Sequence, residues 1–224
     1  MEMNNKETRR VVIGITAHVD AGKTTLAEAM LYRTGQLRKL GRVDHGSAAM
    51  DSHLLERERG ITIFLSQAEL PLGDMEVTLL DTPGHVDFSA EMERTLSVLD
   101  YAILVISGVD GVQAHTRTLW RLLELYRVPT FLFVTKMDFG RRDRDGLMES
   151  LRHELGEGCV DFTPADRERR MEQLATCRED ALEAYLDGGE VPDALVRQLV
   201  RQRLVFPCWF GSGLKLEGID EFLE

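Results

Sequence analysis

The chain has 224 residues, of which 43% are hydrophobic and 29% charged, and its net charge is −11. This length suits one α/β domain with a single hydrophobic core. The acidic balance argues against direct DNA binding, because phosphate backbones favour basic surfaces. No apolar stretch approaches the roughly 20 residues that span a bilayer, and the N-terminus lacks a hydrophobic signal core. We therefore expect a cytoplasmic protein without a membrane partner. We also expect the isolated domain to be a monomer.

The first motif lies between an apolar run at residues 11–15 and a helical pattern. It reads Ala-His-Val-Asp-Ala-Gly-Lys-Thr-Thr over residues 17–25. Backbone N–H groups of such a loop, and of the helix that follows it, converge on one point and favour phosphate oxygens. The lysine adds a positive charge, and the first threonine hydroxyl can bind Mg²⁺. The motif predicts a P-loop that binds a nucleoside triphosphate. Its predicted nucleotide-binding residues are His18, Val19, Asp20, Ala21, Gly22, Lys23, Thr24 and Thr25.

Apolar runs alternate with helical patterns along the chain, which predicts an α/β fold of the P-loop NTPase type with helices on both faces of a mostly parallel sheet. Six strands are expected, at residues 11–16, 61–69, 76–80, 102–106, 130–134 and 205–209. The turn-rich residues 71–74 predict an antiparallel hairpin between the second and third strands. Residues 35–59 are polar without periodicity and predict a long loop beside the phosphate site.

A second motif, Asp-Thr-Pro-Gly, follows the third predicted strand at residues 81–84. Ligands of such folds bind at the carboxyl edge of the sheet, where this motif emerges. Asp81 can hold Mg²⁺ through water. Gly84 can bring its backbone N–H to a terminal phosphate without a side-chain clash. A turn at this place would respond to the presence of that phosphate.

A third motif, Thr135-Lys136-Met137-Asp138, follows the fifth predicted strand. The Asp138 carboxylate can accept hydrogen bonds from the N1 and N2 donors of guanine, which adenine lacks, and the Lys136 stem can lie along the base. A wrong base would leave the carboxylate unpaired. The motif therefore predicts selection of guanine.

Four segments together resemble the translational GTPases, and within them the branch of elongation factor G and the tetracycline-resistance ribosomal protection proteins. They are the P-loop, Glu-Arg-Glu-Arg-Gly-Ile-Thr-Ile at residues 56–63, Asp-Thr-Pro-Gly-His-Val-Asp-Phe at 81–88 and Asp-Gly-Val-Gln-Ala-His-Thr at 110–116. The resemblance implies a GTPase that binds GTP or GDP with Mg²⁺. It implies the ribosome as the partner of the full-length protein, and slow hydrolysis in its absence.

The resemblance also implies roles for single residues. Thr62 corresponds to a switch threonine that binds Mg²⁺ beside Thr24 when the γ-phosphate is present. His85 corresponds to the catalytic histidine that orients the attacking water. Asp20 resembles an aspartate that helps to hold a monovalent cation near the phosphates in some relatives. Positioning and charge neutralisation are the main requirements of phosphoryl transfer, so one histidine can control the rate.

The chain departs from the family at two base-binding positions. The family usually has Asn where Thr135 stands, and Asn both contacts the base and ties its loop to the P-loop. Signal-recognition-particle GTPases, however, have Thr at this position and still select guanine. The last base-contacting loop corresponds to Ser212, Gly213 and Leu214, where the family has Ala at the second position. Gly213 can supply the same backbone N–H to the guanine oxygen.

Charged helical patterns predict a helical insertion at about residues 158–203 of a single GTP-binding domain that covers residues 1–224. As solvated amphipathic helices they suit a surface appendage without chemistry. The resemblance suggests instead the helical insertion of elongation factor G-like proteins, on the ribosome-facing side. The final helical pattern stops after about two turns, whereas the family continues into four more domains. We therefore expect a piece of a longer protein without those downstream domains.

Two alternative functions remain open at this point. One is a regulatory GTPase that does not act on the ribosome, which loss of ribosome-stimulated hydrolysis would favour. The other is a nucleotide-binding module with little catalysis, in which Thr135 marks a loss of activity. A His85→Ala change that left hydrolysis untouched would favour the second alternative.

Overall fold

The computed structural model of the chain describes residues 9–38, 66–82, 90–140, 143–164 and 167–224. Its centre is a seven-stranded sheet in the order β2-β3-β1-β4-β5-β7-β6. Every neighbouring pair of strands is parallel except β2 and β3. The strands are β1 Arg9–Ala17, β2 Ser66–Leu72, β3 Met75–Asp81, β4 Tyr101–Ser107, β5 Thr130–Thr135, β6 Cys159–Asp161 and β7 Phe206–Phe210. The predicted α/β fold class is confirmed.

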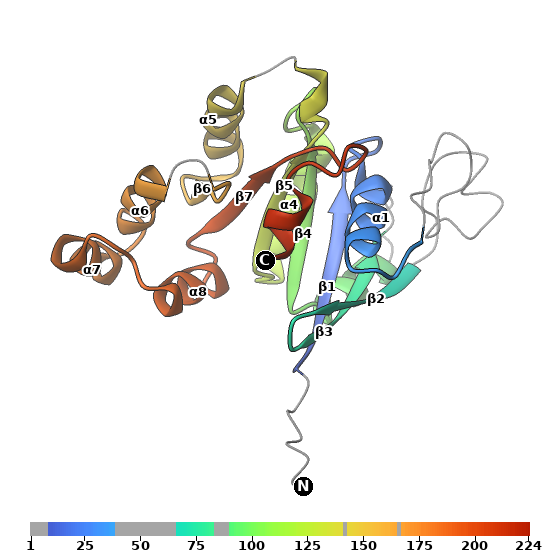
Figure 1. Cartoon of the computed structure of the whole chain (residues 1–224), viewed down its shortest axis with the longest axis horizontal. Helices are drawn as coiled ribbons and strands as arrows, with labels where there is room; N and C mark the ends of the chain where they lie inside the picture. The colour runs from blue at the N-terminus through green and yellow to red at the C-terminus, as the bar shows by residue number, and fades with distance from the viewer. Residues whose placement is uncertain (1–8, 39–65, 83–89, 141–142, 165–166) are drawn as a thin grey trace, which may run out of the picture.

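Helices follow most of the strands, as the alternating pattern predicts (Figure 1). They are α1 Lys23–Arg33, α3 Ala90–Ser97, α4 Ala114–Leu125, the 3₁₀ turn η2 Met137–Phe139, α5 Arg144–Leu155, α6 Arg167–Ala175, α7 Glu179–Gly188, α8 Asp193–Arg201 and α9 Ile219–Leu223. Among the described residues, no helix has both the length and the apolar composition that a membrane crossing requires.

Alternate residues of the central strand β4 point to opposite faces of the sheet. Ala102, Leu104 and Ile106 belong to a core that α4 and α5 complete. Ile103 and Val105 belong to a second core with α1 and α9. This alternation is the ordinary period of a strand, and because both faces are covered, the strand reads as one continuous apolar run. The sheet is therefore covered by helices on both faces.

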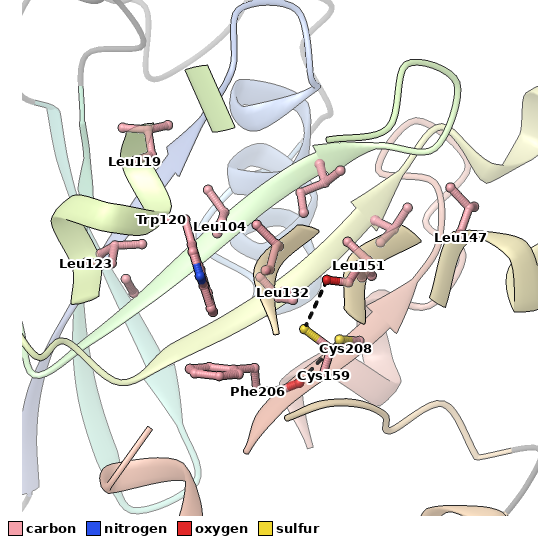
Figure 2. Packing of buried hydrophobic residues seen from close by; sticks show 14 of the residues in the cluster. Leu104, Leu119, Trp120, Leu123, Leu132, Leu147, Leu151, Cys159, Phe206 and Cys208 are labelled. Atoms are coloured by element: carbon pink, nitrogen blue, oxygen red, sulfur yellow. Dashed lines mark hydrogen bonds between the residues drawn. The ribbon is translucent and has the colours of Figure 1, made fainter. Parts of the chain in front are cut away.

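The core under α4 and α5 contains two of the three cysteines (Figure 2). The Cys159 Sγ atom lies 3.8 Å from the carbonyl oxygen of Leu151, and the Cys208 Sγ atom lies 3.3 Å from the carbonyl oxygen of Phe206. Both thiols are free, and burial raises the pKa of Cys208. The Trp120 ring meets the Phe206 ring edge-on, with 4.6 Å between centroids. These cysteines are packing residues of the core.

The hairpin of β2 and β3 is antiparallel, as predicted, and turns at Gly73 and Asp74. Gly73 has φ +58°, a conformation that glycine adopts without strain. Pro71 lies in β2 at the edge of the sheet, the place where a sheet tolerates proline. The predicted strand at 61–69 differs from β2, which begins at Ser66, and residues 61–65 lie outside the described residues.

The prediction of six strands is wrong by one, because β6 adds a strand beside β7. A strand of only three residues is too short to give a periodic pattern. The chain then forms α6, α7 and α8 before it returns to β7, at the end of the sheet away from the hairpin (Figure 1). These helices share a core that includes Val160, Leu174, Ala181 and Leu199. The region predicted as a helical insertion is therefore a packed unit with its own apolar centre.

Candidate nucleotide-binding site

The described parts of the P-loop, Asp-Thr-Pro-Gly and Thr-Lys-Met-Asp motifs converge at the carboxyl edge of the sheet because the strands that precede them are parallel and in register. Ile15 of β1 pairs with Asp81 of β3, and Ser107 of β4 pairs with Thr135 of β5. On the far side of β5, Val134 pairs with Phe210 of β7. The carboxyl ends of β1, β3, β5 and β7 consequently meet at one edge, the place where α/β sheets bind ligands.

The loop between β1 and α1 presents the first turn of the helix to this edge. Gly22 precedes α1 in a left-handed conformation with φ +96°, and Asp20 also has a positive φ of 59°. Gly22 has no side chain to cap the helix, and the first turn contains no acidic residue. The backbone N–H groups of the first turn of α1, together with the positive end of the helix dipole, can therefore bind an anion. Thr24 and Thr25 lie half-buried in this turn.

Lys23 carries its charge into a nearly closed environment. Its side chain is 9% exposed, and its Nζ lies 2.5 Å from Oδ1 of Asp81, which is fully buried. Nζ also donates to the carbonyl oxygen of Thr82. Thr82 is itself held on β1, since its hydroxyl donates to Ile15 O at 2.8 Å. A buried lysine and a buried carboxylate each need a partner of opposite charge. Phosphate oxygens can be that partner for Lys23, and a metal ion can be that partner for Asp81.

Thr135 ties the end of β5 to the P-loop. Its hydroxyl lies against the carbonyl oxygens of Ala21 and Ile106, and the residue is 3% exposed. A Cβ added at Gly22 would make only ordinary contact with the Thr135 Oγ1 atom, at 3.4 Å, so it is the φ of +96° rather than the space that favours glycine there. Thr135 therefore makes the link between the two loops that the family gives to Asn.

The segment after β5 places a carboxylate near the edge. Lys136 has φ 59°, and the N–H of Met137 donates to Gly211 O at 3.1 Å. The side chain of Asp138 is only 10% exposed, and its Oδ2 lies 4.0 Å from Nζ of Lys215. A nearly buried carboxylate at this place needs donors, as the guanine hypothesis requires.

The loop after β7 is held against α1. Ser212 exchanges two backbone hydrogen bonds with Glu217, each of 3.0 Å, and is buried. A Cβ on Gly213 would lie 3.1 Å from Thr25 O, which shows how closely this loop approaches the first turn of α1. Leu214 is half-exposed. The backbone of this loop is therefore fixed relative to the P-loop.

The remaining predicted site residues include His18, which contacts another histidine, and three residues that the structure does not describe. His18 is half-buried, and its ring centroid lies 5.9 Å from that of His115. Thr62, Gly84 and His85 fall outside the described residues, together with most of the predicted loop at 35–59. The sequence analysis did not include Lys215 among the site residues. Its position three residues after Ser212, in the last predicted base-contacting loop, could have indicated it.

The donors and acceptors of this edge match a nucleotide with its metal ion. The first turn of α1 and Lys23 suit phosphate oxygens, whereas Thr24 and Asp81 offer the oxygen ligands that Mg²⁺ prefers. Asp138 suits a base with adjacent N–H donors. Phosphate and base groups therefore have separate places along one edge.

Comparisons with known proteins identify the family of the chain. The family described as "Elongation factor Tu GTP binding domain" matches residues 8–224. An oxytetracycline resistance protein of Streptomyces rimosus is 42% identical over 95% of the chain, and the tetracycline resistance protein TetO of Campylobacter jejuni is 35% identical over 95%. The chain spans 36% of the length of each of these relatives.

A solved crystal structure of a protein from Thermus thermophilus superposes with a TM-score of 0.83 and 30% identity, over 95% of this chain and 39% of that one. The resemblance to translational GTPases is thus confirmed at the level of family and fold. The chain belongs to the family of elongation factor Tu GTP-binding domains.

Proposed function

We propose that this chain is the GTP-binding and GTP-hydrolysing domain of an elongation factor G-like translation factor of the ribosomal protection type. The observation that carries the proposal is the meeting of the P-loop, Asp81, Thr135 and Asp138 at one sheet edge. The names of the relatives add the ribosomal context, since those proteins are named for resistance to tetracyclines. The ribosome is accordingly the proposed partner, and the cytoplasm the proposed location.

The residues of the site would divide the work of binding. Lys23 and the N–H groups of α1 bind the β- and γ-phosphates and neutralise their charge. Thr24 and Asp81 hold Mg²⁺ directly or through water. Asp138 accepts the N–H donors of guanine, and the loop of Ser212 to Leu214 offers a backbone N–H to the guanine oxygen.

Hydrolysis would depend on two residues outside the described part. Thr62 would supply a ligand to Mg²⁺ when the γ-phosphate is present, and His85 would orient the attacking water. Both assignments come from the resemblance. Asp20, exposed and with positive φ, is proposed to help to hold a monovalent cation beside the phosphates. Hydrolysis by the chain alone is slow, because the ribosome aligns the histidine.

A comparison of GTP turnover by the unmodified chain and by His85→Ala tests the catalytic part of this proposal. We expect slow, Mg²⁺-dependent hydrolysis that falls by at least roughly tenfold in the variant, with GDP affinity unchanged. His153→Ala, which changes an exposed histidine of α5, serves as the matched control. Equal hydrolysis by the two histidine variants would contradict the role of His85 and leave a binding module.

A test of the proposed ribosomal role needs a protein of the relatives' full length, of which this chain spans 36%. We propose that further domains follow the chain in its complete protein. Addition of bacterial ribosomes to that protein should raise its GTP turnover by more than roughly tenfold. Turnover that ribosomes do not change would favour a regulatory GTPase with another partner.

A further inference from the structure

A cavity of about 270 Å³ lies between α5, β6 and α6. These three elements lie at the end of the sheet opposite the hairpin (Figure 1). Four arginines and two aspartates line it. Its lining therefore carries two more positive than negative side chains, in a chain whose net charge is −11. A local excess of guanidinium groups in an acidic protein favours an anion as ligand.

Each aspartate of the lining already has its own arginine. Asp161 pairs with Arg144 and also accepts the backbone N–H of Thr163 at 2.8 Å. Asp145 accepts a hydrogen bond of 2.8 Å from Arg169. These carboxylates are neutralised in place, so the other two arginines retain their charge for a further partner.

Arg152 and Arg170 have no carboxylate partner within the part of the chain that the structure describes. Nε of Arg152 donates to Cys159 O at 3.2 Å, and NH1 of Arg170 donates to Phe162 O at 3.1 Å. A guanidinium has five N–H donors, so each keeps several for a ligand. Both residues are half-buried, and the Arg170 guanidinium lies over the Phe162 ring at 5.3 Å, which fixes its plane.

Gln173 adds an unpartnered polar group to the same lining. Its amide oxygen is buried and has no hydrogen-bond partner among the described residues. Such a group costs free energy unless something completes its hydrogen bonding. The amide oxygen is an acceptor, so only the NH₂ group of Gln173 can donate to an anion.

We propose that the cavity binds a phosphate group of a small anionic ligand through the guanidinium groups of Arg152 and Arg170, with the amide NH₂ group of Gln173 as the third donor. A tetrahedral oxyanion can accept several charge-assisted hydrogen bonds at once. Pockets for drug-sized ligands run from about 300 to 1,000 Å³, so this cavity suits a phosphate or pyrophosphate moiety better than a whole nucleotide. The bound anion would join α5 to α6 and brace the unit of α6, α7 and α8 against the sheet.

A calorimetric titration of the chain with pyrophosphate, without Mg²⁺, tests this site. The P-loop also offers a phosphate site, so Lys23→Ala separates the two. We expect Arg152→Gln/Arg170→Gln to weaken pyrophosphate binding at one site by at least roughly tenfold. That binding should persist in Lys23→Ala. The control Arg121→Gln/Arg197→Gln, which removes the same charge from exposed positions outside the cavity, should also retain it.

An isotherm that Arg152→Gln/Arg170→Gln leaves unchanged, or equal losses in the exposed-arginine control, would overturn the proposal. Tighter, Arg170-dependent binding of a short single-stranded RNA would overturn the choice of a small ligand. If the double variant melts at a lower temperature, Arg170→Lys provides the second test, because it keeps the charge but loses the planar fork, and affinity should still fall. Failure of guanine nucleotides to bind would count against the proposed function and leave this cavity untouched.

Discussion

A buried hydroxyl, that of Thr135, connects the end of β5 to the P-loop. Thr135 lies in β5 and reaches the carbonyl oxygen of Ala21, far away along the chain. This contact positions the segment that carries Asp138 relative to the loop that carries Lys23. Threonine at this position therefore fixes the segment of Asp138 relative to the P-loop.

Thr135→Val tests this connection because valine keeps the shape and removes the hydroxyl. We expect a loss of about 1 kcal/mol in the free energy of unfolding, since the carbonyl oxygen of Ala21 loses its donor. GDP affinity should fall by roughly tenfold, a cost of about 1.4 kcal/mol. Thr118→Val, which removes an exposed hydroxyl from α4, should leave GDP affinity unchanged. Equal GDP affinities of the two variants would contradict the assigned role.

At the scale of elements, one arginine fastens the end of α8 to the sheet. Arg203 lies over the rings of Trp120 and Phe206, at 5.0 and 5.1 Å, and donates to the Thr130 hydroxyl at 2.9 Å. It also donates to the carbonyl oxygen of Val128. Burial lowers the pKa of the guanidinium from its ordinary value. The Arg203 side chain, which follows α8, thus contacts α4, β5 and β7.

Arg203→Ala should therefore lower the free energy of unfolding by about 2 to 3 kcal/mol, from the loss of two cation–π contacts and two hydrogen bonds. Urea denaturation, followed by circular dichroism, measures the change. Arg121→Ala removes an exposed arginine from α4 and should change stability by less than about 0.5 kcal/mol. A small loss for Arg203→Ala, similar to that of the control, would mean that the unit of α6, α7 and α8 packs without this side chain.

The ion pair between α4 and α5 gives a dependence of stability on pH. Arg117 binds Glu154 through two hydrogen bonds of 2.7 and 2.9 Å, and these bonds lower the pKa of Glu154 from its ordinary value. A lowered pKa in the folded state stabilises the fold above the unfolded pKa, which is about 4.3 for glutamate. That contribution is lost as the pH falls through the folded pKa.

Glu154→Gln should consequently be less stable than the unmodified chain at pH 7, with the difference shrinking as the pH falls below about 4.3. Thermal melts at a series of pH values measure this difference. Glu149→Gln, an exposed carboxylate on the same helix, is the matched control. A difference that stays constant from neutral to acid pH would contradict the assigned ion pair.

For the whole molecule, the order of elements could be predicted from the sequence, whereas the contacts between distant segments could not. The strand β4 was predictable because it is buried on both faces and reads as an apolar run. The strand β6 was not, because three residues show no period. The link from Thr135 to Ala21, and the proximity of Lys215 to Asp138, depend on the register of parallel strands rather than on local pattern.

We predict that bound nucleotide stabilises the whole fold. GDP at about 100 times its Kd should stabilise the chain by about 2.7 kcal/mol, which corresponds to a rise in Tm of roughly 5 to 10 °C. The rise should be absent in Lys23→Ala, because the P-loop lysine contributes the charge that holds the phosphates. A similar rise with ATP would show binding without selection of guanine.

The most direct test of the central claim is a titration of the chain with fluorescent GDP, in which unlabelled GDP, GTP and ATP compete, with and without Mg²⁺. The account predicts binding in the micromolar range or tighter, displacement by GDP and GTP, and no displacement by excess ATP, because Asp138 is matched to guanine. Mg²⁺ should strengthen GTP binding. Equal displacement by ATP, or no binding of fluorescent GDP, would contradict the assignment of this site to guanine nucleotides.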